Sequence, residues 1–147
     1  MIKEFKLDKS GKTNALYFKK NISRNLTNKI LNNLIQISKI KQENIRLCFH
    51  EKKSSELHNM VNIIYKKNNT DKYHKHLFKD EIYHLIKGSI EINIILNKKK
   101  KKILLNKNNT IYRMSKNTFH KVNSLSRFSI FHEIRKGPFK KGDSIFK

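Results

Sequence analysis

His74-Lys75-His76-Leu77-Phe78-Lys79-Asp80-Glu81-Ile82-Tyr83-His84-Leu85-Ile86-Lys87-Gly88 is the most informative stretch of this sequence. Residues two apart on a β-strand project from the same face, so His74 and His76 are expected to point to one side. A turn then leads to Glu81, which opens the next strand and can bring a carboxylate beside the two imidazoles. His120, at the start of a distant strand, can supply a third imidazole if the strands close into a barrel.

The spacing His-x-His-x₄-Glu-x₆-Gly, followed by a distant histidine, resembles the two-part signature of the cupin superfamily. The resemblance implies a small β-barrel that binds one divalent metal through four residues, His74, His76, Glu81 and His120. The second motif departs from the usual Pro-x-Gly-x-x-His, because this chain has Ser115 and Asn117 in place of the proline and glycine. Asn117 can occupy the left-handed turn that usually requires glycine.

Further segments are similar to the WbuC family of cupin-fold metalloproteins, from about residue 22 to the end of the chain. They are Arg46-Leu47-Cys48-Phe49-His50, Leu57-His58-Asn59-Met60, Tyr112-Arg113-Met114-Ser115, Phe131-His132-Glu133-Ile134, Gly137-Pro138-Phe139 and Asp143-Ser144-Ile145-Phe146. Members of that family are associated with bacterial O-antigen and surface-polysaccharide gene clusters. The resemblance therefore implies the fold, the metal and a ligand derived from a carbohydrate, such as a sugar or a nucleotide-sugar.

The rest of the sequence predicts an all-β protein with one N-terminal helix. Apolar residues recur at helical spacing from Ser23 to Lys39, with Asn21 or Ser23 available as the N-cap. After Glu43 the periodicity changes to two, as in an antiparallel sandwich, jelly roll or barrel. The predicted strands are Arg46–Phe49, Met60–Tyr65, Glu81–Ile86, Ser89–Leu96, Lys102–Leu105, Ile111–Met114, Phe119–Asn123 and Phe128–Ile134, and the lysine run Lys98–Lys102 is predicted to be a hairpin tip.

With 147 residues, the chain has the length of a single domain. We predict one cupin domain over residues 1–147, with an N-terminal extension and helix at 1–44 and the β-barrel at 45–147. No run of about 18 apolar residues and no signal peptide is present, so a cytoplasmic protein without membrane contact is expected. Because such barrels expose sheet edges and faces that association can cover, we also expect a homodimer.

The formal net charge of +23 suggests a nucleic-acid partner at first sight, but the composition argues against one. Of the 34 basic residues, 29 are lysine and 5 are arginine, and asparagine and isoleucine are abundant, which is the composition expected of AT-rich coding sequence. Arginine is the residue suited to bidentate contact with phosphate and guanine. The charge is therefore interpreted as compositional drift, and a nucleic-acid role is disfavoured.

The lone Cys48 cannot supply a cysteine-rich metal site, so histidine and carboxylate ligands are expected. Three imidazoles and one carboxylate suit Fe²⁺, Mn²⁺, Ni²⁺ or Zn²⁺ rather than calcium. Strand parity places Tyr83 on the same inner face as Glu81 and turns His84 outward, which excludes His84 as a ligand.

Tyr83 and His58 are the candidate catalytic residues that could move a proton. Other side chains carry a charge or a ring that could bind an anionic or cyclic ligand. These candidate ligand-binding residues are Lys79, Tyr112, Arg113, His50 and His132. Two classes of function stay open. The protein could be a metal-dependent isomerase, epimerase or lyase, with an Fe²⁺-dependent dioxygenase as a variant, or a non-catalytic sugar-binding or regulatory module.

Overall fold

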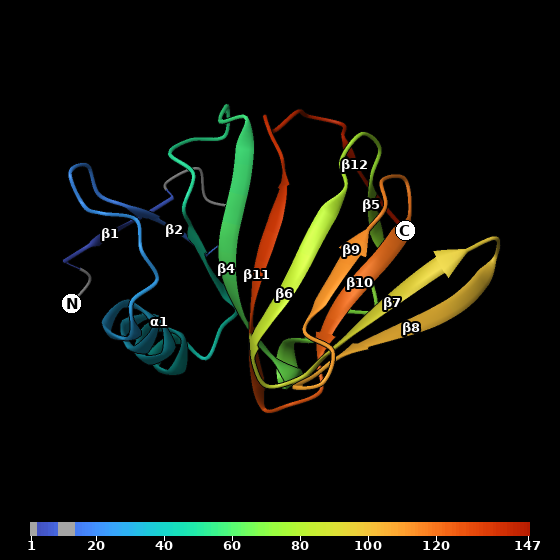
Figure 1. The fold of residues 1–147 in the computed structure, drawn as a ribbon, viewed down its shortest axis with the longest axis horizontal. Helices are drawn as coiled ribbons and strands as arrows, with labels where there is room; N and C mark the ends of the chain where they lie inside the picture. Colours follow the sequence, from blue (N-terminus) through green and yellow to red (C-terminus); the bar gives the residue numbers. More distant parts are fainter. Residues whose placement is uncertain (1–2, 9–13) are drawn as a thin grey trace.

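The computed structural model describes residues 3–8 and 14–147, which form two β-sheets facing each other and one α-helix (Figure 1). The larger sheet has seven strands in the order β1-β2-β3-β4-β11-β6-β9, all antiparallel except the parallel pair β2 and β3. Their bounds are β1 Phe5–Leu7, β2 Ala15–Phe18, β3 Ile45–Cys48, β4 Leu57–Tyr65, β11 Phe128–Lys136, β6 Glu81–Lys87 and β9 Ile111–Met114.

The smaller sheet has five antiparallel strands in the order β12-β5-β10-β7-β8. Its strands are β12 Ser144–Phe146, β5 His74–His76, β10 Phe119–Ser124, β7 Ile90–Leu96 and β8 Lys99–Leu105, and one 3₁₀ turn, Lys66–Asn68, follows β4. Eight predicted strands are confirmed, with ends that differ by a few residues.

The two faces of the larger sheet bury different cores. Leu47, Val61 and Ile63 face the helix α1 (Asn28–Lys41), which covers this outer face with Ile30 and Leu34. Residues of the opposite parity face the smaller sheet, and there the apolar side chains of both sheets form a second core that consists of Tyr83, Leu85, Ile90, Ile92, Ile94, Leu105, Met114 and Phe131. The inner face is therefore where side chains from the two sheets meet.

The helix starts later than its sequence pattern predicts. Its N-cap is Thr27, whose hydroxyl oxygen accepts a hydrogen bond from the Ile30 N–H at 3.2 Å. The predicted caps Asn21 and Ser23 are wrong, since Asn21 has a left-handed backbone (φ 65°) and helical structure begins only at Asn28. The N-terminal extension also contributes β1 and β2 to the larger sheet, which the sequence analysis did not predict.

A hairpin does connect β7 and β8, as predicted, but its turn lies at the start of the lysine run and not over the whole of it. Asn97 and Lys98 form the turn, with φ values of 50° and 62°, as in the left-handed two-residue turns that suit hairpins. The remaining lysines of the run, Lys99–Lys102, lie in β8 and pair with β7.

No helix in the described part of the chain is long and apolar enough to cross a membrane.

Candidate metal centre

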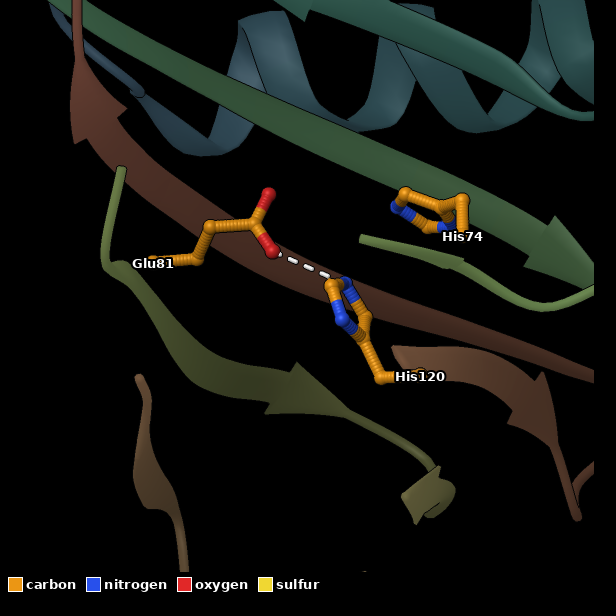
Figure 2. A group of neighbouring side chains, drawn as sticks. All are labelled: His74, Glu81 and His120. Carbon is orange, nitrogen blue, oxygen red and sulfur yellow. Dashed lines mark ion pairs between the residues drawn. The ribbon is translucent and has the colours of Figure 1, made fainter. Parts of the chain in front are cut away.

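Three elements from both sheets bring the predicted metal ligands together on the inner face. His74 opens β5 and lies directly opposite His120 of β10 in the smaller sheet. Glu81 opens β6 in the larger sheet, so its carboxylate approaches the two imidazoles from across the interior (Figure 2). One ligand atom from each of these three residues lies within 4.8 Å of the others. We call this group the His74–Glu81–His120 cluster.

The cluster is buried, which makes its charges interact strongly. The exposed fraction is 1% for the side chains of both Glu81 and His120, and Glu81 Oε2 lies 2.8 Å from His120 Nε2. Burial alone would raise the pKa of Glu81, but its interactions with His120 and His76 outweigh burial and hold the pKa well below the ordinary value. Glu81 therefore presents an ionised carboxylate to the interior.

The two imidazoles of the cluster are in different states. Burial lowers the pKa of His74 to about 4, with the nearby His120 adding to the effect, so His74 is neutral at physiological pH. Burial also opposes the charge on His120, but the hydrogen bond and charge of Glu81 raise its pKa above the ordinary value. His120 Nδ1–H donates to the Thr118 carbonyl oxygen at 2.8 Å, which fixes the ring and turns Nε2 toward the cluster.

His76, the fourth predicted ligand, lies beside the cluster with its Nε2 facing an arginine. Arg135 Nη1 donates to His76 Nε2 at 3.1 Å and to Glu81 Oε1 at 3.3 Å. On its other side, His76 Nδ1 is 3.0 Å from the Ser144 hydroxyl oxygen. Because a guanidinium only donates, His76 Nε2 offers Arg135 the lone pair that a metal would need. Metal ligation by His76 therefore requires Arg135 to move aside, and it stays a prediction.

The donor set fits a divalent transition metal by its chemistry. It combines the ionised carboxylate of Glu81 with the Nε2 of His120 and the neutral imidazole of His74, and His76 lies next to them. Imidazole with one carboxylate suits iron, manganese, nickel, cobalt or zinc. His74, Glu81 and His120 would hold such a metal, with His76 as the further candidate.

The parity prediction for Tyr83 and His84 is confirmed. Tyr83 is 2% exposed and its Oη donates to Glu81 Oε2 at 2.9 Å, with His120 Nε2 at 3.0 Å, whereas His84 is exposed on the outer face. Burial and the charge of Glu81 raise the pKa of Tyr83 well above its ordinary value. The phenol therefore keeps its proton and acts as a hydrogen-bond donor to the carboxylate.

Replacing Tyr83 by phenylalanine removes that donor and keeps the ring that packs on Phe131 at a centroid distance of 5.8 Å. We expect Tyr83→Phe to bind one metal at saturation but with an affinity lower by ~10-fold, as is usual when a partner of a metal ligand is lost. Competition with a chelator measures the affinity. His84→Ala is the control on the same strand and should bind metal like the wild type; equal affinities of all three proteins would contradict this role for Tyr83.

Four predicted ligand-binding residues form no hydrogen bond or ion pair with the three residues of the cluster. Lys79 is buried in contact with the Pro138 carbonyl oxygen at 2.7 Å and the Asp143 carboxylate at 3.2 Å, so its charge is used within the protein. Arg113 points outward and pairs with Asp80. His132 lies on the outer face of β11, and Tyr112 packs on the inner core from β9.

The other two histidines of interest, His50 and His58, line a cavity of about 220 Å³ on the inner face over β2, β3 and β4. His58 lies directly opposite Arg135, which in turn lies opposite Glu81, so the cavity and the cluster are neighbours along one row of the sheet. Arg135, Arg46 and Tyr17 also line it, and the sequence analysis missed all three. The available signal was parity: Arg135 comes two residues after Glu133, one residue beyond the predicted strand Phe128–Ile134, and the observed strand β11 extends to Lys136.

The chain matches no protein-family model and no curated protein. Solved structures share its fold at low identity. A protein from Shewanella oneidensis aligns over 66% of this chain and 65% of its own, with 12% identity and a TM-score of 0.57. CapF, solved with the inhibitor 3-isopropenyl-tropolone, aligns over 70% of this chain and 31% of its own, with 13% identity and a TM-score of 0.59.

The iron(II) form of HppE aligns over 63% of this chain and 50% of its own, with 13% identity and a TM-score of 0.52. This chain thus spans less than two thirds of the length of each of these three structures. At sequence identities this low, the structural similarity shows a shared fold and nothing more. The class that fold and neighbours define is the cupin fold, mostly β-strand with one helix, as the sequence predicts.

Proposed function

We propose that this protein is a metal-binding cupin that acts on or binds a small carbohydrate-derived ligand, a sugar or nucleotide-sugar, in bacterial surface-polysaccharide (O-antigen) biosynthesis. The observation that carries the proposal is the buried His74–Glu81–His120 cluster next to a cavity with polar walls. A buried charged cluster that adjoins a cavity has little use in stability alone and is typical of a functional site. HppE, which is similar in fold, is described in iron(II) and cobalt(II) forms.

A divalent metal held by the cluster would supply Lewis acidity toward a ligand carbonyl or hydroxyl. The chain's own residues have separate tasks. Tyr83 orients the Glu81 carboxylate through its hydroxyl, at 2.9 Å. Arg135 lies between the cluster and the cavity and can donate to a ligand from nitrogens other than Nη1.

His58 is the candidate for accepting a hydrogen bond from a ligand hydroxyl. Its Nε2–H donates to the Lys53 carbonyl oxygen at 3.0 Å, which leaves Nδ1 as the acceptor. Burial, together with the neighbouring His50, lowers the pKa of His58 to about 4, so the ring is neutral at physiological pH. A neutral imidazole nitrogen can accept a hydrogen bond from a sugar hydroxyl, whereas an ammonium or guanidinium group can only donate one.

A thermal-shift screen of the metal-loaded protein against nucleotide-sugars, free sugars and small organic acids tests the proposal. A ligand that binds the folded state should raise the melting temperature, and the shift should grow with concentration as mass action requires. Product analysis of each hit then separates an enzyme, which converts it, from a binding module, which returns it unchanged. A screen in which only oligonucleotides stabilise the protein would contradict the proposal and restore a nucleic-acid role.

One domain, a cytoplasmic location and a homodimer remain part of this proposal. The exposed apolar residues Ile82, Ile86 and Ile111 on the outer face of β6 and β9 are compatible with self-association.

A further inference from the structure

The cavity beside the cluster has arginine side chains in its wall that the proposed chemistry at the metal does not require. It lies on the inner face and is lined by strands β2, β3, β4 and β11, with Tyr17, Arg46, Cys48, Met60, His58 and Arg135 among the lining residues. The other charged residues that line it are Lys53 and Asp8, which lie 3.9 Å apart as an ion pair. Their charges offset each other, and Arg135 forms ion pairs with Glu81 and Glu133, so among the described lining residues Arg46 is the cation left without an ion pair.

Among the described residues that line the cavity, Arg46 is the cation that forms no ion pair with a carboxylate. Its Nε donates to Asn62 Oδ1 at 3.1 Å, which fixes the guanidinium, and its two terminal nitrogens make no other hydrogen bond with the described part of the chain. No carboxylate of residues 3–8 or 14–147 forms an ion pair with it. A half-buried guanidinium with a fixed orientation and unused donors is suited to bidentate binding of a carboxylate or a phosphate.

A chain of polar contacts connects Arg46 to the cluster across four adjacent strands. Asn62 Nδ2 donates to Glu133 Oε2 at 3.2 Å, and Glu133 Oε1 lies 3.3 Å from Arg135 Nη1. Arg135 then donates to Glu81 Oε1 at 3.3 Å. The contacts fix both arginines with respect to Glu81. They also use Glu133 as a partner of Arg135, so that the charge of Arg46 is left for a ligand.

Two histidines of the same lining offer hydrogen-bond acceptors. The rings of His50 and His58 are stacked, with centroids 4.1 Å apart and planes 5° apart. His50 Nδ1–H donates to the Asn59 carbonyl oxygen at 3.1 Å, so its Nε2 is the acceptor, as Nδ1 is in His58. Burial lowers the pKa of His50, the hydrogen bond to the Asn59 carbonyl oxygen opposes that effect, and the charges of Arg135 and Arg46 add to the lowering.

We infer that this cavity binds the anionic group of a small hydroxylated ligand, with a carboxylate or phosphate on Arg46 and hydroxyl groups toward His50 and His58. Arg135 then faces the part of the ligand that approaches the cluster. That the cavity and the cluster share one ligand rests on the proposed function. Anion binding at Arg46 does not, because it requires no metal.

The volume of the cavity indicates the size of the group that binds beside Arg46. At about 30 Å³ per water molecule, about 220 Å³ holds roughly seven waters. Pockets for drug-sized molecules are roughly 300 Å³ or larger. This space fits a sugar acid, a hydroxy acid or a small phosphate ester. It adjoins a second pocket of about 650 Å³, with which it shares Asp8, Tyr17 and Lys53, and the two together have room for a larger ligand such as a nucleotide-sugar.

Calorimetric titration of the metal-free protein with inorganic phosphate and with acetate, at a constant 0.15 M ionic strength to screen the general positive charge, tests the inference. We expect saturable binding of at least one anion, weakened ~10-fold or more in Arg46→Gln. Arg46→Lys keeps the charge and loses the planar fork, so its affinity should fall between those of Arg46→Gln and the wild type. The anion that binds tighter tells phosphate from carboxylate ligands.

Arg127→Gln is the matched control, because Arg127 is exposed and lies away from the cavity lining. It should bind the anion like the wild type. An equal loss in Arg127→Gln, or no saturable binding of either anion by the wild type, would overturn the inference. If Arg46→Gln does not fold, as judged by circular dichroism, Arg46→Lys decides, and wild-type affinity in Arg46→Lys would then count against bidentate binding. Metal content, measured in parallel, reports separately on the proposed function.

Discussion

Replacing His120 by alanine is expected to remove the divalent metal from this protein. Wild-type protein purified without a chelator or a polyhistidine tag should contain about one equivalent of transition metal, as a site of this donor type does. His120 contributes a fully buried Nε2, 2.8 Å from Glu81, in a ring fixed by Thr118. Its loss leaves too few nitrogen ligands, and metal affinity should fall by ~100-fold or more. Elemental analysis measures the metal content.

Two further variants separate ligation from a folding defect. Glu81→Gln keeps the side-chain volume and removes the charge, so it should lose metal while circular dichroism stays that of the wild type. His84→Ala, from the exposed face of the same strand, should keep the metal. Retention of a full equivalent of metal in His120→Ala and Glu81→Gln would refute the assignment.

His76→Ala distinguishes three protein ligands from four. Arg135 now bonds His76 Nε2 at 3.1 Å. If metal displaces the guanidinium, as the sequence motif predicts, His76→Ala should lose metal as His120→Ala does. Because a divalent cation and Arg135 both neutralise Glu81, one can replace the other without leaving the buried carboxylate unpaired.

Local patterns were sufficient to predict much of the fold. The strict alternation in Ile90-Glu91-Ile92 and the turn at Gly88, where φ is 81°, depend on neighbours in sequence, and both are found as expected. Asn117 has φ 58°, so asparagine does occupy the left-handed position where the motif usually has glycine. The inward Tyr83 and the outward His84 follow from the same period of two.

What could not be predicted depends on pairing between distant strands. β1 and β2 have three and four residues, too short for a periodic signal, yet they add Tyr17 to the cavity wall. Arg135 becomes part of the site only because β11 lies between β4 and β6, opposite His58 on one side and Glu81 on the other. Nothing in the sequence near Arg135 specifies that register. Lys79 looked like a ligand-binding cation, but Asp143, far along the chain, neutralises it.

Gly137→Ala is expected to destabilise the protein by about 3 kcal/mol or more, because the added methyl group has no room. A Cβ at this position would lie 1.8 Å from the Ser55 carbonyl oxygen and 2.8 Å from His58 Cδ2. The backbone cannot move away easily, because Gly137 N–H donates to the Glu56 carbonyl oxygen at 2.6 Å and holds the end of β11 against that loop.

Gly142→Ala is the control, since it makes the same change of residue. The added Cβ meets no atom within 4 Å, so the variant suffers only the strain of its φ of 85°, about 1–2 kcal/mol. Urea unfolding of both variants measures the difference. Because the contact involves His58, any Gly137→Ala protein that folds should also bind anions more weakly in the cavity, whereas a stability equal to that of Gly142→Ala would show that the loop before β4 is not packed on Gly137.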